Sequence, residues 1–279
     1  EGAGQTFPVA FGFAPSESAE SWRFFVRHLA MALNLAQIPL TVVSDRCKGI
    51  DTAIAEILPN ASHALCAFHI RQNVESRFGK GAASRVWSIA NASTPHDYVV
   101  AMETLGTISP AARQYLEAIP RQQWVLAFFP GARYGQITSN IAESTNAWIL
   151  NQRKYPPLRF FIEVIGRVNE RFAERRPLYE NKNPGDIVDE IFAEIGKNFE
   201  DGRRLEARNI MGPVFEVQSR GAGRQPRVVD LERRLCTCMQ FQDLGYPCVH
   251  ACSAALQANV DVLGCASKSA ALGPCRWSI

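Results

Sequence analysis

The stretch that decides the fold runs from Leu40 to Val74 and reads LTVVSDRCKGIDTAIAEILPNASHALCAFHIRQNV. It opens with an apolar, β-branched run, which is typical of a central sheet strand covered on both faces. A helix is predicted to begin after Gly49 and to end before Pro59. A second short strand is predicted at 64–66, and it leads into another helix. The order strand, helix, strand predicts an α/β fold.

Three side chains in this stretch follow the predicted strands. Asp45 comes directly after the first strand, and Cys66 and His69 form a Cys-x-x-His at the end of the second. Open α/β sheets place their ligands at the carboxyl ends of strands, so these residues are candidate catalytic groups. The alternatives are a turn or N-cap role for Asp45 and buried structural roles for Cys66 and His69.

The same stretch offers a second grouping of metal-ligand types. Cys47 and His63 join Cys66 and His69 as two thiols and two imidazoles, which are ligand types of zinc. The spacing of these four residues is irregular, and it supports a zinc site less than a regular spacing would.

Two further elements are predicted upstream of Leu40. Aromatic and apolar residues alternate at period two from Phe7 to Phe13, which predicts a half-buried strand ending at the turn Ala14-Pro15. An amphipathic helix follows, because apolar residues recur at helical spacing from Trp22 to Leu33.

Helices dominate the middle of the chain. From Ile70 to Phe129 the sequence predicts helix after helix, with start signals at Thr94-Pro95 and Ser109-Pro110 and no convincing strand. This region is expected to be a helical insertion over about 70–137. Further helices are predicted near Phe161 and Ile191. The polar, proline-bearing segment 175–186 between them is a candidate hinge.

Glu143 lies in the segment TSNIAESTNAWILNQR, residues 138–153. Both faces of the helix predicted here are apolar, so the carboxylate of Glu143 is expected to point into packed structure. The alternative is a capping box, in which Asn140 is the N-cap and Glu143 stands three residues later.

The C-terminal part carries the most regular metal-ligand spacing in the chain. Cys236 and Cys238 form a Cys-x-Cys after a strand-like segment, and Cys248 and His250 form a Cys-x-His at the start of an apolar helix. Three thiolates and one imidazole complete a tetrahedral zinc set with no position left for chemistry. The spacing predicts a structural zinc module over 213–258 that folds around its metal; unrelated buried cysteines are the alternative.

Several basic residues surround this module. Arginine binds phosphate oxygens bidentately, which favours a nucleic-acid backbone as partner. A solvated basic face is the alternative. The arginines in question are Arg220, Arg224, Arg227, Arg233 and Arg234. Cys252, Cys265 and Cys275 lie outside the zinc pattern and are expected to be free thiols.

Composition sets broader bounds. The 279 residues carry a net charge of +3 and are 47% apolar, as in an ordinary globular protein. The sequence contains no run of 18 apolar residues, so no membrane span is predicted. No leader-like segment precedes Phe7. Eight cysteines without a leader favour reduced thiols and metal binding over disulfides. The first residue is Glu1, which suggests a sequence cut from a longer one.

These motifs, in this order, resemble the Mutator-like element (MULE) transposases. The resemblance rests on FPVAF…ESWRFFVRHL, SDRCKGI…AEILPNASHALCAFHI and SNIAESTNAWI, and the Cys-x-Cys and Cys-x-His pair resembles a SWIM-type zinc finger. It covers about Phe7 to Leu256. It implies an RNase H-like (DDE transposase) core with a large all-helical insertion, in which three acids hold two Mg²⁺ or Mn²⁺ ions. The domains implied are 1–176 (transposase), 177–212 (helical linker), 213–258 (zinc finger) and 259–279 (tail).

The resemblance also implies roles for residues. Asp45 corresponds to the second acid, Glu143 to the third, and Cys66 with His69 to the Cys-x-x-His of the family, with no zinc role for Cys47 or His63. The first acid has no counterpart on a strand of this sequence. We therefore expect DNA and zinc binding, and do not expect strand transfer by this chain as it stands.

The implied partners are double-stranded transposon ends and a second copy of the chain, in the nucleus. Two other interpretations stay open. The protein could be a domesticated transcription regulator that binds DNA without cleaving it, or a module whose zinc finger docks another protein.

Overall fold

The fold is described from a computed structural model, which covers residues 8–35, 38, 40–47, 49–138, 144–145, 147–178, 186–220 and 225–267. The predicted strand–helix–strand unit is present. Strands β1 (Thr41–Ser44) and β2 (Ser62–Leu65) pair in parallel, in register from Thr41 opposite Ser62 to Ser44 opposite Leu65. Helix α2 (Ile50–Ile57) connects them, as predicted.

Helix α1 (Ala19–Leu33) precedes this unit and packs on α2. It begins at Ser18, whose hydroxyl accepts a hydrogen bond from the backbone N–H of Ser21. Gly49 begins α2 with φ +94°, and a Cβ there would lie 2.6 Å from the backbone of Ala19. Glycine is therefore required where the loop after β1 approaches the start of α1.

Two expectations for this region need correction. The period-two segment forms no strand over residues 8–14 (Phe7 lies outside the described residues). Its aromatic rings pack instead against a later helix, with ring centroids 5.0 Å apart for Phe13 and Phe160. Packing on the surface of this helix gives the alternating rings their contacts, so the segment does not need to pair with a strand. In addition, β1 was expected to be a central strand, but among the described residues its only paired neighbour is β2.

The helical region after β2 is confirmed. Thr94 and Ser109 cap α6 and α7 with their hydroxyls, as the Thr-Pro and Ser-Pro pairs predicted. The core of this region includes the fully buried Trp124 and side chains from α3 to α7. The elements are α3 (Ala67–Phe78), α4 (Lys80–Ala83), α5 (Val86–Ala90), α6 (Pro95–Ile108), α7 (Pro110–Glu117), η2 (Arg121–Gln123) and η3 (Leu126–Phe128).

After η3 the chain returns to the parallel strands. The hydroxyl of Thr41 donates to the carbonyl of Ala132 over 2.6 Å, and the N–H of Ala67 donates to the carbonyl of Ile137 over 2.9 Å. Segment 131–137 therefore contacts both β1 and the start of α3.

The next segment contains the third implied acid. Residues 144–145 and 147–148 are helical, in line with the predicted helix, but Asn140 and Glu143 lie outside the described residues. Helix α9 (Pro157–Arg175) follows η4 (Gln152–Lys154) and buries Phe160 and Val164 against Ile149. Most of the candidate hinge also lies outside the described residues, apart from the end of α9, η5 (Arg176–Leu178) and Asp186.

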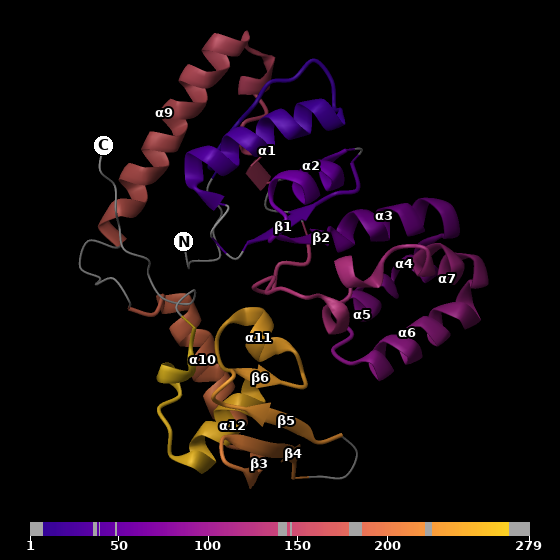
Figure 1. The fold of residues 1–279 in the computed structure, drawn as a ribbon, viewed down its shortest axis with the longest axis vertical. Coiled ribbons are helices and arrows are strands. Elements are labelled where there is room, and N and C mark those ends of the chain that lie inside the picture. Colours follow the sequence, from indigo (N-terminus) through magenta and orange to yellow (C-terminus); the bar gives the residue numbers. More distant parts are fainter. Residues whose placement is uncertain are drawn as a thin grey trace.

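The C-terminal part forms a second α/β unit, at the bottom of Figure 1. Its antiparallel sheet has the order β3-β4-β5-β6 and packs against α12, which in turn packs against α10. The shared core includes Phe215, Val217 and Phe241. The elements are α10 (Asp189–Gly202), β3 (Leu205–Met211), β4 (Val214–Ser219), β5 (Arg227–Asp230), β6 (Leu235–Cys236), α11 (Gln240–Leu244), α12 (Val249–Ala258) and η6 (Leu263–Cys265).

This unit is larger than the 213–258 module expected from the sequence. Ile195 of α10 lies in its core, and β3 pairs along β4 although the sequence predicted a helical linker over 177–212. Val262 and Cys265 are also buried in it, so the described part of the tail belongs to the same unit. Among the described residues, no helix combines the length and apolar character needed to cross a bilayer.

Candidate metal centre and strand-end site

The strand-end residues lie together as the sequence predicted. Asp45 follows β1 and Cys66 follows β2, and the N–H of Cys66 donates to the carbonyl of Ser44 over 2.7 Å. Cys66 is the N-cap of α3, and His69 stands on the first turn of that helix. The parallel register therefore brings the acid and the Cys-x-x-His to one edge of the two-stranded sheet. Their catalytic roles stay predictions.

Asp45 also has a local structural role. Its Oδ1 accepts a hydrogen bond of 3.2 Å from the N–H of Cys47, which is the turn arrangement considered as the alternative. Behind it, the Ser44 hydroxyl lies 2.7 Å from the carbonyl of Asp45 and 2.8 Å from Nε2 of His63. If Nε2 carries the imidazole proton, His63 donates to Ser44 and Ser44 donates to Asp45. This chain fixes the backbone from which the Asp45 carboxylate projects.

The surroundings of Asp45 include one acid that the sequence did not single out. Burial, followed by hydrogen bonding to the side chain of Glu17 and the charge of Asp45, raises the pKa of Cys47 to about 12. The Cys47 thiol is thus protonated at neutral pH, between two carboxylates. Glu17 precedes α1 and reaches this site only through the packing of α1 on α2, so no local pattern could indicate it.

The alternative zinc site at this edge does not form. Cys47, His63, Cys66 and His69 make no metal-binding group among the described residues. Burial lowers the pKa of His63, which is hydrogen-bonded to Ser44. The approach of Glu143 to Asp45 stays a prediction, because Glu143 lies outside the described residues.

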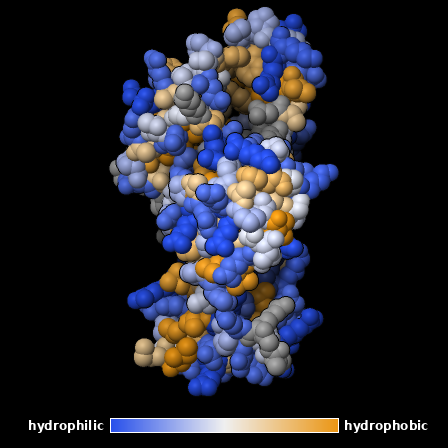
Figure 2. All heavy atoms as spheres, turned by 90° about the vertical axis from the view of Figure 1, so that its right-hand side faces the viewer, coloured by the Kyte–Doolittle hydropathy of each residue, from blue (hydrophilic) through white to orange (hydrophobic). Residues whose placement is uncertain are grey.

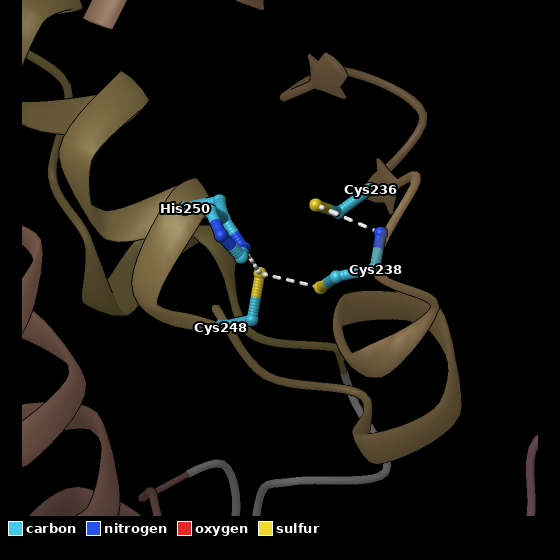
Figure 3. A group of neighbouring side chains, drawn as sticks. All are labelled: Cys236, Cys238, Cys248 and His250. Atoms are coloured by element: carbon cyan, nitrogen blue, oxygen red, sulfur yellow. Dashed lines mark hydrogen bonds between the residues drawn. The ribbon is translucent and has the colours of Figure 1, made fainter. Parts of the chain in front are cut away.

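The C-terminal ligands converge (Figure 3). Cys236 and Cys238 come from the end of β6 and the turn after it, while Cys248 and His250 come from the start of α12. One ligand atom from each residue lies within 4.8 Å of the other three. The Cys238 and Cys248 sulfur atoms are 3.6 Å apart, close to the separation of about 3.8 Å that tetrahedral zinc with bonds of about 2.3 Å would give.

The electrostatics of the cluster favour deprotonation of one sulfur. Hydrogen bonds from the thiols of Cys236 and Cys248 lower the pKa of Cys238, whereas hydrogen bonding to Cys238 raises the pKa of Cys236 to about 12. A bound cation would favour the deprotonated form of all three thiols, because metal ligation requires every thiol to lose its proton. The donor set can hold a metal ion such as zinc and fits a closed, structural site.

Gln242 holds the turn that carries Cys236 and Cys238 in place. Its Oε1 accepts from the N–H of Cys236 over 3.0 Å, and its Nε2 donates to the carbonyl of Cys236 over 3.0 Å. Met239 makes the turn with φ +64°. Both residues lie within α11 or at its start, so α11 fixes the geometry of Cys236 and Cys238. No local sequence pattern indicates this role of Gln242.

The predicted phosphate-binding arginines differ in their surroundings. Arg220 and Arg233 lie 3.7 and 3.8 Å from carboxylates of their own module, Glu206 and Asp230. Arg227 donates instead to the carbonyl of Thr237, between Cys236 and Cys238, and Arg234 donates to the carbonyl of Gly264, each over 3.5 Å. Arg224 lies outside the described residues. Figure 2 shows hydrophilic side chains over most of one face of the molecule, with apolar side chains in separate patches.

The strand-end site lies in the part of the chain that matches a known family. The model of the MULE transposase domain matches residues 1–73, a range that contains Asp45, Cys66 and His69. This match supports a MULE-type transposase. The matched range ends within α3, before most of the helical region and before Glu143.

Two curated proteins are similar to parts of the chain. A transposase for insertion sequence element IS905 from Lactococcus lactis is 28% identical over 159 residues, which is 54% of this chain and 40% of that protein. A PKS-NRPS hybrid synthetase, cheA, from Chaetomium globosum is 30% identical over 74 residues, which is 25% of this chain and 2% of that protein. The chain thus spans well under two thirds of either relative. A transposase-like function is supported by the family match and the first of these.

Proposed function

We propose that this chain is a transposase-derived protein of the Mutator-like class that binds zinc and duplex DNA. The match of residues 1–73 to the MULE transposase domain carries the proposal. The cluster of three cysteines and one histidine supports the zinc-binding part. The DNA-binding part rests on the family and on the arginines beside that cluster.

At the strand ends, the proposal assigns an RNase H-like site to Asp45, with Glu143 as a second acid. In such sites divalent Mg²⁺ or Mn²⁺ activates a water or a DNA 3′-hydroxyl and stabilises the oxygens of the displacement. The residues of this chain would supply carboxylate oxygens, and the hydrogen bonds from His63 through Ser44 would hold the Asp45 backbone in position. Two carboxylates make a weak cage for a hard cation. Residues 1–279 alone are therefore expected not to nick DNA.

The zinc cluster has a different role in this proposal. All four ligand positions are protein side chains, which is typical of structural zinc. The module would present Arg227 and Arg234 to phosphates while its core stays fixed. In the sequence, Arg224 stands between β4 and β5. It is proposed to contact phosphates together with Arg227 and Arg234.

The test measures duplex binding at several salt concentrations. Each phosphate neutralised by the protein steepens the salt dependence of affinity by about one unit of log–log slope. Replacing Arg224, Arg227 and Arg234 together by Ala should flatten the slope by up to about three and weaken binding to all sequences alike.

A matched control removes the same charge elsewhere. Arg23, Arg113 and Arg159 each lie beside a glutamate of the N-terminal part, and their triple replacement by Ala should leave the slope nearly unchanged. If both triple variants bind as the unchanged protein does, the arginines near the cluster are only solvated surface. Metal analysis that finds no zinc in purified protein would refute the zinc-binding part independently.

A further inference from the structure

The two α/β units are joined through a backbone site for a carboxylate. Three consecutive N–H groups, those of Arg133, Tyr134 and Gly135, donate to Asp243 of the zinc module. Arg133 reaches Oδ1 over 2.8 Å, Tyr134 reaches the carbonyl oxygen over 2.8 Å, and Gly135 reaches Oδ2 over 3.3 Å. Tyr134 and Gly135 have positive φ values of 52° and 73°. Successive N–H groups can form an anion-binding nest. Here the N–H groups of Arg133 and Gly135 bind the carboxylate of a side chain from α11, and that of Tyr134 binds the main-chain carbonyl of the same residue.

The charge of Asp243 also compensates a buried cation. The Arg133 side chain is 1% exposed, and its Nε lies 3.9 Å from Oδ1 of Asp243. Its Nη1 donates to the carbonyl of Trp124, and its guanidinium lies 5.2 Å from the ring centre of Phe129. Within the described part of the chain, its Nε and Nη2 make no hydrogen bond. Burial lowers the pKa of Arg133, and the charge of Asp243 opposes that change. A buried charge that loses its partner is costly, so this contact is selective for a carboxylate.

Asp243 is coupled to the metal cluster through its own helix. Its N–H donates to the carbonyl of Met239, the residue after Cys238, and its neighbour Gln242 brackets the backbone of Cys236. Helix α11 has only five residues. A helix this short is not stable by itself. Its position therefore depends on the turn that carries Cys236 and Cys238, which a bound metal would hold in place.

The other side of the nest leads to the strand-end site. Segment 131–137 contains the three N–H donors, and it also contacts Thr41 of β1 and Ala67 of α3. Ala67 follows Cys66 directly. A continuous set of contacts therefore runs from Cys236 through α11, Asp243 and segment 131–137 to the start of α3.

We propose that Asp243 transmits metal occupancy of the cysteine–histidine cluster to segment 131–137 of the transposase domain. With the cluster filled, α11 is held and Asp243 occupies the nest. With the cluster empty, α11 loses its anchor, the nest loses its anion and the buried Arg133 loses its compensating charge. Asp243 is thus a positioning residue that makes the order of the strand-end site depend on metal. The inference rests on the proposed zinc binding.

The test is amide hydrogen exchange of the full chain with zinc bound and after chelation. The amides of residues 133–135 should exchange at least about tenfold faster without zinc, as should the C-terminal module. The decisive variant is Asp243→Asn in the zinc-bound state. It should keep one zinc per chain and a protected module, yet expose the amides of Arg133 and Gly135, because an amide cannot replace the charge or both acceptor oxygens.

A matched control and a reciprocal measurement complete the design. Asp261 accepts N–H groups of Leu263 and Gly264 within the same module, so Asp261→Asn should leave the exchange of 133–135 unchanged. Coupling between two sites is reciprocal, so Asp243→Asn should also weaken zinc binding by about fivefold or more, although Asp243 is not a ligand. If Asp243 only held segment 131–137 in place, with no coupling to the cluster, its replacement would not change the zinc affinity.

The outcomes separate this inference from the proposed function. Zinc binding with identical exchange of residues 133–135 in the presence and absence of zinc would overturn the coupling and leave the zinc proposal standing. Absence of zinc binding would overturn both. If Asp243→Asn does not fold, the comparison of the unchanged protein with and without zinc still decides the question.

Discussion

Replacing Cys248 by Ser tests the metal cluster most directly. Cys248 is fully buried at the start of α12, and its sulfur lies 3.6 Å from that of Cys238 and 4.0 Å from Nδ1 of His250. Structural zinc contributes about 10–16 kcal/mol of folding free energy in small zinc-binding peptides. An equal share for one of four ligands is about 2.5–4 kcal/mol, a large part of the roughly 5–15 kcal/mol that stabilises a whole domain.

The change should therefore weaken zinc binding by about 10²- to 10³-fold and unfold the C-terminal module. The extent of unfolding follows from the core. Because Ile195 of α10 and the strand β3 belong to the same packed unit, the loss should spread over about 189–265 and not stop at residue 213. Strands β1 and β2, with α1 to α7, have separate cores and should stay folded.

The assay is metal content together with far-ultraviolet circular dichroism and regional hydrogen exchange. The control is Cys252→Ser in the same helix. Cys252 is also fully buried, but its sulfur contacts the carbonyl of Pro247 over 3.8 Å and is no ligand, so this variant should keep its zinc. A Cys248→Ser protein with normal zinc content and unchanged melting would refute the assignment of the ligand set.

Three smaller changes test the strand-end site. Burial lowers the pKa of His63 below its usual 6.5, so the folded state favours the neutral imidazole; stability should be greatest above pH 6.5 and decline as the pH falls from there toward the lower folded-state pKa. Urea unfolding at several pH values should show this decline, and His63→Gln should remove it; an unchanged pH dependence would contradict it. Gly49→Ala should cost more than about 1 kcal/mol in denaturant unfolding, because a Cβ would meet the backbone of Ala19 at a positive φ; an unaffected midpoint would show that the loop can shift. Asp45→Asn should weaken the binding of Mn²⁺ followed by titration calorimetry, and equal binding by both proteins would place the ion elsewhere.

The local elements were predictable because each depends on neighbours in sequence. The apolar run before Ser44, the spacing of α1 and the Thr-Pro and Ser-Pro starts all predicted the right secondary structure, since capping and periodicity act within a few residues. The strand expected over 7–13 is not formed by residues 8–13, because alternating aromatic rings can pack on a helix as well as on a sheet. The convergence of the four candidate ligands was also predictable, because two short pairs of metal-ligand residue types stand close together in the sequence.

What the sequence by itself determined, then, is the strand–helix–strand unit, the helical region and the four candidate ligands of the cluster. The tertiary structure alone decided that Glu17 lies beside Cys47, that Gln242 brackets Cys236, and that Asp243 enters a nest 110 residues earlier in the chain at Arg133. The last two contacts depend on backbone N–H groups, and the last one also on the burial of Arg133. Neither is encoded in a local pattern, because every residue type except proline can present an N–H and only packing excludes the water that would otherwise compete for it.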